Sequence, residues 1–284
     1  VYTGAEPCFV DSDSSGNMNP DLLVEALDQL AAEGVTPAAI LPVDLLGKVV
    51  NHERIDAIAA ARAIPVLSDA AESLGARRGG RPAVSFGVAA AVSFNGNKVM
   101  TTSGGGALLT DDGELAKQVR YLATQARQPV VHYEHTDIGY NYRMSSLLAA
   151  VGRAQLARLD EMMARRRATR LRYQELFADV PGVTVFGTPD DEDNCWLTAI
   201  LVDAGTAGWK PSELASVLAD ANIESRPLWK PMHLQPIFAD ARGRIDGTSQ
   251  HLFETGLSLP SGSVLTSEQI DTVVDVIRTF LEQH

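Results

Sequence analysis

Short apolar segments alternate with helix-period segments through the first half of the chain, and this order constrains the fold more than any other feature. The apolar segments end in acidic or small residues and cover residues 7–11, 39–43, 65–69, 89–94 and 106–110. Helical periodicity lies between them, at about residues 20–33, 53–63 and 113–123. Strands that are apolar on both faces and separated by helices are typical of a parallel or mostly parallel sheet covered on both sides.

The pattern changes near residue 143. A helix predicted at about residues 145–156 leads into a long charged helix at 159–177, whose basic triplet at 165–167 is better explained as a solvated face than as an anion site. Later segments predict a mixed order, with strands at 183–186, 195–202 and 223–227 and helices at 210–221 and 266–283. We therefore predict a large domain over residues 1–156 and a smaller α+β domain over residues 157–284.

Composition excludes several classes of protein. The 284 residues are 45% hydrophobic, enough to bury a deep site. A formal charge of −12 argues against a nucleic-acid partner. Cys8 and Cys195 lie far apart without metal-ligand spacing, so we expect neither a disulfide framework nor a metal site. Since no leader segment or membrane-spanning apolar run is present, we expect a cytoplasmic protein.

Lys98 follows the apolar segment 89–94 and precedes small hydroxylated residues and three glycines. Ligands of parallel sheets gather beyond the carboxyl ends of the strands, so this position is one where a binding site is expected. A partly desolvated amine with space beside it can attack a carbonyl and form a Schiff base. The alternative is an ordinary solvated surface lysine.

Asp69 and Ser93 also stand at predicted strand ends. A buried carboxylate needs a cationic partner, and no basic residue follows Asp69 until Arg77. Asp69 is therefore either a helix N-cap or the partner of a protonated ring nitrogen on a ligand. Ser93 either bonds to backbone or donates to a phosphate. An amine, a carboxylate and a hydroxyl together are what pyridoxal phosphate requires.

Five ordered segments carry a resemblance to a known family: residues 69–76, 93–106, 139–144, 149–156 and 259–262. They resemble the DegT/DnrJ/EryC1/StrS family of nucleotide-sugar aminotransferases, which have fold type I and depend on pyridoxal phosphate. The resemblance runs across nearly the whole chain. It implies a large domain with a mostly parallel sheet covered by helices, followed by a smaller α+β C-terminal domain.

The resemblance implies a role for each candidate residue. Lys98 matches the lysine that forms the internal aldimine and shuttles the proton, and Asp69 the carboxylate that pairs with the pyridinium nitrogen. Glu72, often glutamine in the family, lies near the phenolic oxygen and has to be protonated or held by a donor. Ser93 matches a phosphate ligand. Asn141 matches an asparagine that reaches the neighbouring subunit's phosphate, which implies a homodimer; a turn residue is the alternative.

Three segments indicate the substrate: residues 94–98, 194–198 and 226–236 look most like enzymes that aminate C4 of UDP-linked 4-keto-6-deoxy-N-acetylhexosamines, as in bacillosamine-type pathways. Trp229, Lys230 and His233 are candidate substrate contacts, since an aromatic ring and a cation suit a nucleotide diphosphate. Trp229 could instead pack one domain against the other. The implied reaction is a ping-pong transamination with L-glutamate as amino donor. Dehydratase relatives carry histidine in place of Lys98, so the lysine favours transamination.

Family members also carry a segment ahead of the position that matches Val1. That segment holds a phosphate cup and an aromatic residue that stacks on the cofactor ring. A chain without it is expected to bind pyridoxal phosphate more weakly. The alternative function is therefore a non-catalytic or truncated family member that acts as a binding or regulatory protein. A desulfurase is disfavoured, because neither cysteine lies in a glycine-rich loop.

Overall fold

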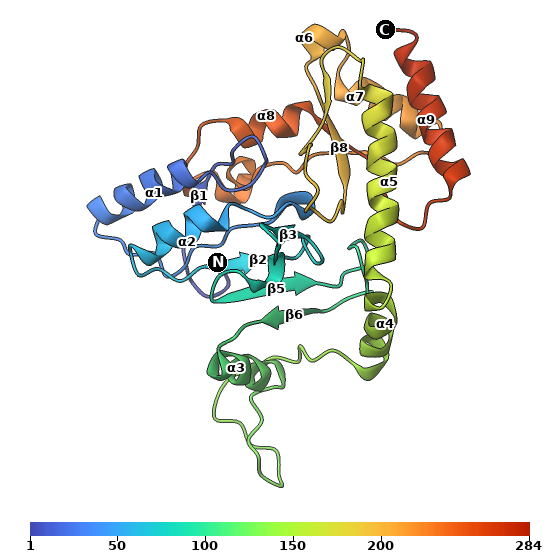
Figure 1. The fold of residues 1–284 in the computed structure, drawn as a ribbon. Coiled ribbons are helices and arrows are strands. Elements are labelled where there is room, and N and C mark those ends of the chain that lie inside the picture. Colours follow the sequence, from blue (N-terminus) through green and yellow to red (C-terminus); the bar gives the residue numbers. More distant parts are fainter.

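A three-stranded sheet forms the centre of the N-terminal part in the computed structural model, which describes residues 1–284 (Figure 1). Its strands are β2 (Leu67–Asp69), β5 (Ala89–Ser93) and β6 (Gly106–Leu109), in the order β2-β5-β6. β2 and β5 are parallel, whereas β6 runs antiparallel to β5. The sheet is thus mixed, with its parallel pair where the alternation of strands and helices predicted it.

Helices α1 (Pro20–Ala32) and α2 (His52–Ala60) lie beside this sheet, and each buries an apolar face in a shared core. Asn19 caps α1 by accepting a hydrogen bond from the Asp21 amide, and Pro20 occupies the first helical turn, where its missing N–H costs nothing. The resulting core consists of aliphatic side chains from both helices and the adjoining segments: Leu23, Leu27, Ile40, Val50, Ile55, Ala59, Ile64 and Val66.

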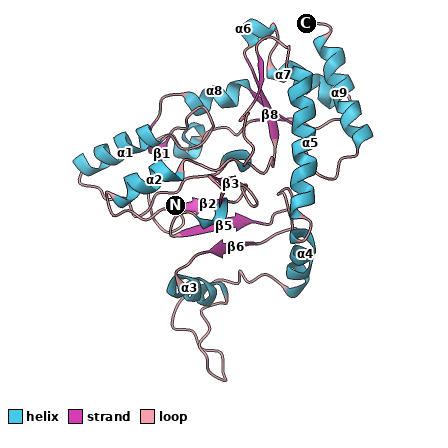
Figure 2. Ribbon diagram, viewed as in Figure 1, coloured by secondary structure: helices cyan, strands magenta, loops and turns pink.

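Two of the strands predicted in the N-terminal part do not become strands of the central sheet. β1 (Cys8–Val10) lies next to α1 and pairs in parallel with β10 (Arg242–Arg244) instead of joining β2 and β5 (Figure 2). The segment 39–43 makes only isolated parallel bridges, from Ile40 to Val66 and from Val43 to Asp69. A strand from the C-terminal half of the chain therefore pairs with the first strand of the N-terminal part.

A four-stranded antiparallel sheet organises the C-terminal part. Its order is β7 (Val183–Val185), β8 (Thr198–Val202), β11 (Gly256–Leu259) and β9 (Arg226–Pro227). Helices α5 (Leu159–Phe177), α7 (Pro211–Asp220) and α9 (Ser267–Leu281) bury their apolar faces in a core of 16 residues on this sheet. The strand predicted at 195–202 begins only at Thr198, because Cys195 turns the chain with a φ of 53°.

Helices α3 (Gly113–Ala123) and α4 (Ser146–Leu156) begin at side-chain caps on Asp112 and Ser145. Between them a loop of about residues 125–144 projects from the body of the molecule (Figure 1). The remaining helices and strands are short: β3 (Arg77–Arg78), β4 (Arg81–Pro82), α6 (Ala204–Ala207) and α8 (Thr248–Thr255). None of the helices is both long and apolar enough to cross a membrane.

A further apolar cluster joins the two parts of the chain. Leu46 and Val99 from the N-terminal part pack with Phe186, Trp196 and other apolar side chains from the C-terminal part. Because Val99 directly follows Lys98, this contact surface fixes the loop that carries the predicted nucleophile.

Candidate active site

Three of the predicted site residues meet at one edge of the central sheet. Asp69 is the last residue of β2 and lies in register with Ala91 of β5. Ser93 ends β5, and Lys98 lies in the loop that follows. That loop is closed by backbone hydrogen bonds from the Phe94 amide to Gly105 and from the Thr102 amide to Phe94, both 2.9 Å. The parallel pairing of β2 and β5 therefore brings these groups to the same carboxyl edge, as predicted.

Lys98 is not a solvated surface residue. Its side chain is 14% exposed, and its Nζ lies 3.4 Å from Glu72 Oε1. The same Nζ lies 4.1 Å from the centroid of the Trp196 ring. The amine is thus enclosed by one carboxylate and one aromatic face.

Glu72 is held by two donors. The Leu46 amide donates to its Oε2 at 2.8 Å, and Lys98 Nζ faces its Oε1. Burial raises the pKa of the Glu72 carboxyl above its usual range, while the Leu46 amide and the Lys98 charge act in the opposite direction. A glutamate at this position was expected to need a proton or a donor, and the structure supplies donors.

Asp69 accepts one hydrogen bond, from the Ala71 amide at 3.1 Å, and forms no ion pair. No helix starts after it, so the helix N-cap interpretation is wrong. Ser93 Oγ accepts a hydrogen bond from the Asn95 amide at 3.3 Å, and no acceptor in the chain takes its proton. A carboxylate without a cation, a hydroxyl free to donate and an enclosed amine at one sheet edge match the groups that pyridoxal phosphate requires.

Asn141 lies apart from the other candidates within this chain. It is exposed on the loop between α3 and α4, where it forms an isolated bridge with Thr124. No hydrogen bond joins its side chain to the sheet edge that carries Lys98. This placement leaves the Asn141 side chain free to face a second molecule.

The candidate substrate residues divide into two groups. Trp229 lies edge-on to Trp196, with ring centroids 6.2 Å apart, and lines a cavity of about 770 Å³ that also includes Asn97. Lys230 and His233 do not line this cavity. A cavity of about 1000 Å³ lies elsewhere in the C-terminal part and contains none of the predicted site residues. We therefore take the cavity beside Trp196 as the one related to the chemistry.

Trp196 contacts the candidate nucleophile, and sequence reasoning did not assign it to the site. Its segment, residues 194–198, stood out only as one that resembles C4 aminotransferases. Its contact with Lys98 joins residues 98 positions apart, which no local pattern could predict. The available signal was a tryptophan near the start of the strand predicted at residues 195–202.

Comparisons with known proteins agree with this geometry. Residues 1–278 match the sequence profile of the DegT/DnrJ/EryC1/StrS aminotransferase family. EpsN of Bacillus subtilis, assigned as a pyridoxal phosphate-dependent aminotransferase, is 40% identical over 98% of this chain and 72% of its own length. A GDP-perosamine synthase of Caulobacter vibrioides is 33% identical over 96% of this chain and 73% of its own. The crystal structure of a family aminotransferase from Brucella abortus superposes with a TM-score of 0.89 at 33% identity, covering 98% of this chain and 74% of that one.

The chain belongs to the DegT/DnrJ/EryC1/StrS aminotransferase family. It is therefore a sugar aminotransferase of fold type I that depends on pyridoxal phosphate, and the fold, enzyme class and cofactor expected from the sequence are confirmed. The cofactor also fits the structure, since Lys98, Asp69 and Ser93 offer an amine, a carboxylate and a hydroxyl at one sheet edge.

Proposed function

We propose that this enzyme transfers an amino group from L-glutamate to C4 of a UDP-linked 4-keto-6-deoxy-N-acetylhexosamine. The coarser activity, amination of a nucleotide-linked keto sugar, follows from the family. The finer assignment is supported by the segments around Asn194 and Trp229, which resemble C4 aminotransferases and line or adjoin the cavity beside Trp196. Trp229, Lys230 and His233 are the proposed substrate contacts, and the cavity lining favours Trp229 among them.

The observation that carries the proposed mechanism is the enclosed amine of Lys98 at the end of β5. When bound, pyridoxal phosphate supplies a carbonyl that an amine can attack and a ring that withdraws electrons from the reacting carbon. Lys98 Nζ is the proposed attacking amine and the base that takes a proton from the donor's reacting carbon and returns it. Asp69 provides the negative charge that keeps a ring nitrogen protonated.

The other residues are proposed to bind and orient. Ser93 offers its free hydroxyl to the phosphate group. Glu72, held by the Leu46 amide, stands beside the Lys98 amine and would face the phenolic oxygen of the bound cofactor. Asn141 is proposed to reach the phosphate group of a second subunit.

A homodimer is therefore part of the proposal. The loop that carries Asn141 and the helix α4 after it expose many large apolar side chains, which marks a surface for protein contact. These are Val131, Tyr133, Ile138, Tyr140, Tyr142, Leu147, Val151 and Leu156.

The role of Lys98 is tested with Lys98→Ala. The wild-type protein with pyridoxal phosphate should show a visible absorption band that L-glutamate bleaches, because transamination leaves the donor's nitrogen on the cofactor as a saturated amine. Lys98→Ala should lose the lysine-dependent band and all transamination. Lys117→Ala, at an exposed lysine of α3, is the matched control and should behave as the wild type. An unchanged band in Lys98→Ala contradicts the assignment, and a wild-type band that glutamate leaves unchanged supports a non-catalytic binding protein.

The sugar assignment is tested by product analysis. The enzyme should form an amino sugar from the UDP-linked 4-keto-6-deoxy-N-acetylhexosamine about tenfold or more faster than from a GDP-linked 4-keto sugar, the alternative that the related GDP-perosamine synthase suggests. A reversed preference overturns the UDP assignment and leaves the aminotransferase class intact.

A further inference from the structure

The free amine of Lys98 has a defined resting place formed by residues from both parts of the chain. Its Nζ lies 4.1 Å from the Trp196 ring centroid and 3.4 Å from Glu72 Oε1. Glu72 belongs to the N-terminal part, whereas Trp196 comes from the segment before β8 and is only 2% exposed. A cation over the face of a buried indole is attracted by the ring's negative face.

Three hydrogen bonds hold Trp196, one through its ring and two through its backbone. Its Nε1 donates to the Asn97 carbonyl at 2.7 Å, which ties the ring to the residue next to Lys98. Its backbone amide donates to Asn194 Oδ1 at 2.9 Å. Its carbonyl accepts a hydrogen bond from the buried Arg166.

Asn194 also fixes Glu72 relative to Trp196. Its Nδ2 donates to the carbonyls of Glu72, at 2.7 Å, and of Leu74, at 3.0 Å. A Cβ at position 47 would lie 1.8 Å from Asn194 Oδ1, so Gly47 leaves the space that this amide occupies. The two groups that enclose the amine are therefore held to one another through a single side chain.

We infer that Trp196 is a positioning residue that keeps the uncombined ammonium group of Lys98 against Glu72, beside the sheet edge where Asp69 and Ser93 lie. The inference rests on the role proposed for Lys98. The ring attracts the charged amine and shields it from solvent, so the amine stays within the site whenever it is not bonded to another group. Since Trp196 comes from the C-terminal part, the amine is placed only when the two parts of the chain are packed together.

The first test is chemical labelling of Lys98 in the full chain freed of cofactor by dialysis. Acetic anhydride labelling, read by peptide mass spectrometry, should be about two- to tenfold faster at neutral pH in Trp196→Leu than in the wild type, because the ring no longer covers the amine. Labelling of the exposed Lys117 should not change, and Trp209→Phe, in the core of the C-terminal part, is the matched control. Equal labelling of Lys98 in Trp196→Leu and wild type overturns the inference.

The second test uses a conservative variant, so the inference remains testable if Trp196→Leu does not fold. Lys98→Met removes the cation but keeps a side chain of similar length, and should change tryptophan emission in the wild-type background. In a Trp196→Phe background the same substitution should leave the emission unchanged. An equal change in both backgrounds contradicts the contact. Neither test depends on cofactor binding, so a failed role for Lys98 in catalysis, seen with Lys98→Ala, is distinguishable from a failed role for Trp196.

Discussion

At the scale of single residues, Asp44 is a buried acid that the proposed chemistry does not use. Its side chain is fully buried, with Ser73 Oγ donating to Oδ2 at 2.6 Å and the Val50 amide donating to Oδ1 at 2.9 Å. Burial, with the nearby carboxylates of Asp69 and Glu72 adding to it, raises the pKa of Asp44 from 3.8 to about 6, against the lowering effect of its two donors. The charged form of Asp44 is therefore disfavoured in the fold relative to an ordinary aspartate.

Asp44 makes stability depend on pH. A raised pKa in the folded protein favours the protonated fold, so this group's contribution is fully present below pH 3.8 and is lost as the pH rises through about 6. Asp44→Asn keeps a neutral side chain of the same shape. It should raise the free energy of unfolding at pH 7.5 by about 1–3 kcal/mol and flatten its dependence between pH 4 and 6.

Urea unfolding at several pH values measures this effect. Asp111→Asn, at an exposed position, is the control and should leave the pH dependence as in the wild type. If the free energy of unfolding depends on pH as steeply in Asp44→Asn as in the wild type, another group causes that dependence.

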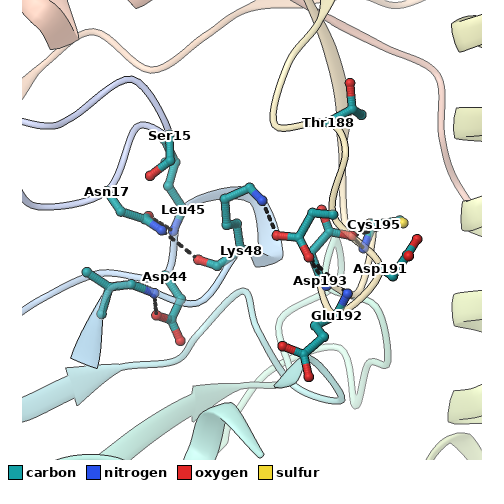
Figure 3. A network of polar contacts seen from close by, with 12 residues as sticks. Ser15, Asn17, Asp44, Leu45, Lys48, Thr188, Asp191, Glu192, Asp193 and Cys195 are labelled. Atoms are coloured by element: carbon teal, nitrogen blue, oxygen red, sulfur yellow. Dashed lines mark hydrogen bonds and ion pairs between the residues drawn. The ribbon is translucent and has the colours of Figure 1, made fainter. Parts of the chain in front are cut away.

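At the scale of elements, the acidic loop of residues 190–193 joins the two parts of the chain. Asp190 pairs with Lys48, and Figure 3 shows Asp191, Glu192 and Asp193 on the loop that lies beside this lysine. Glu192 accepts hydrogen bonds from the Gly79 and Gly80 amides, both at 2.7 Å. The loop leads directly into Asn194 and Trp196, so its placement sets the position of the residues around Lys98.

The ion pair between Asp193 and Arg170 should contribute most to this placement. Both side chains are buried, and removal of one partner leaves an uncompensated charge. Asp193→Ala should lower the free energy of unfolding by about 3–5 kcal/mol in urea unfolding. Asp191→Ala removes a fully exposed partner of Arg167 in the same loop and should cost less than about 0.5 kcal/mol. Similar losses in the two variants would show that burial of the pair is unimportant.

Local sequence signals predicted the bounds of helices better than the pairing of strands. The helices α3 and α5 were predicted with the bounds that the structure gives, since caps and periodicity are local. β1 was placed in the wrong sheet because its partner, Arg242–Arg244, lies over 230 residues away and is a short polar strand. The location of Lys98, Asp69 and Ser93 at one sheet edge could be predicted, because the ends of apolar strands are visible in the sequence. The contact between Trp196 and Lys98 could not, because it depends on how the two parts of the chain pack.

At the scale of the whole molecule, the loop after α3 and the outer face of α4 lack a partner within the chain. Leu147 is 81% exposed, and the exposed Val151 lies one turn further along the same face of the helix. Solvation of so many apolar side chains is unfavourable in a lone chain, and Asn141 stands at the edge of this surface. The surface and the exposed asparagine together support the proposed dimer with shared sites.

Charge placed on this face should separate the subunits. Leu147→Glu with Val151→Glu should convert the proposed dimer to a monomer in size-exclusion chromatography with light scattering, because buried unpaired carboxylates oppose association. The monomer should also bind pyridoxal phosphate at least tenfold more weakly, since Asn141 of a partner subunit is then missing from each site. Leu171→Glu adds a charge at an exposed position of α5 outside this face and should leave both properties unchanged. If the double variant stays dimeric, the interface lies elsewhere. If it is a monomer that binds pyridoxal phosphate as tightly as the wild type, Asn141 does not contribute to the neighbouring site.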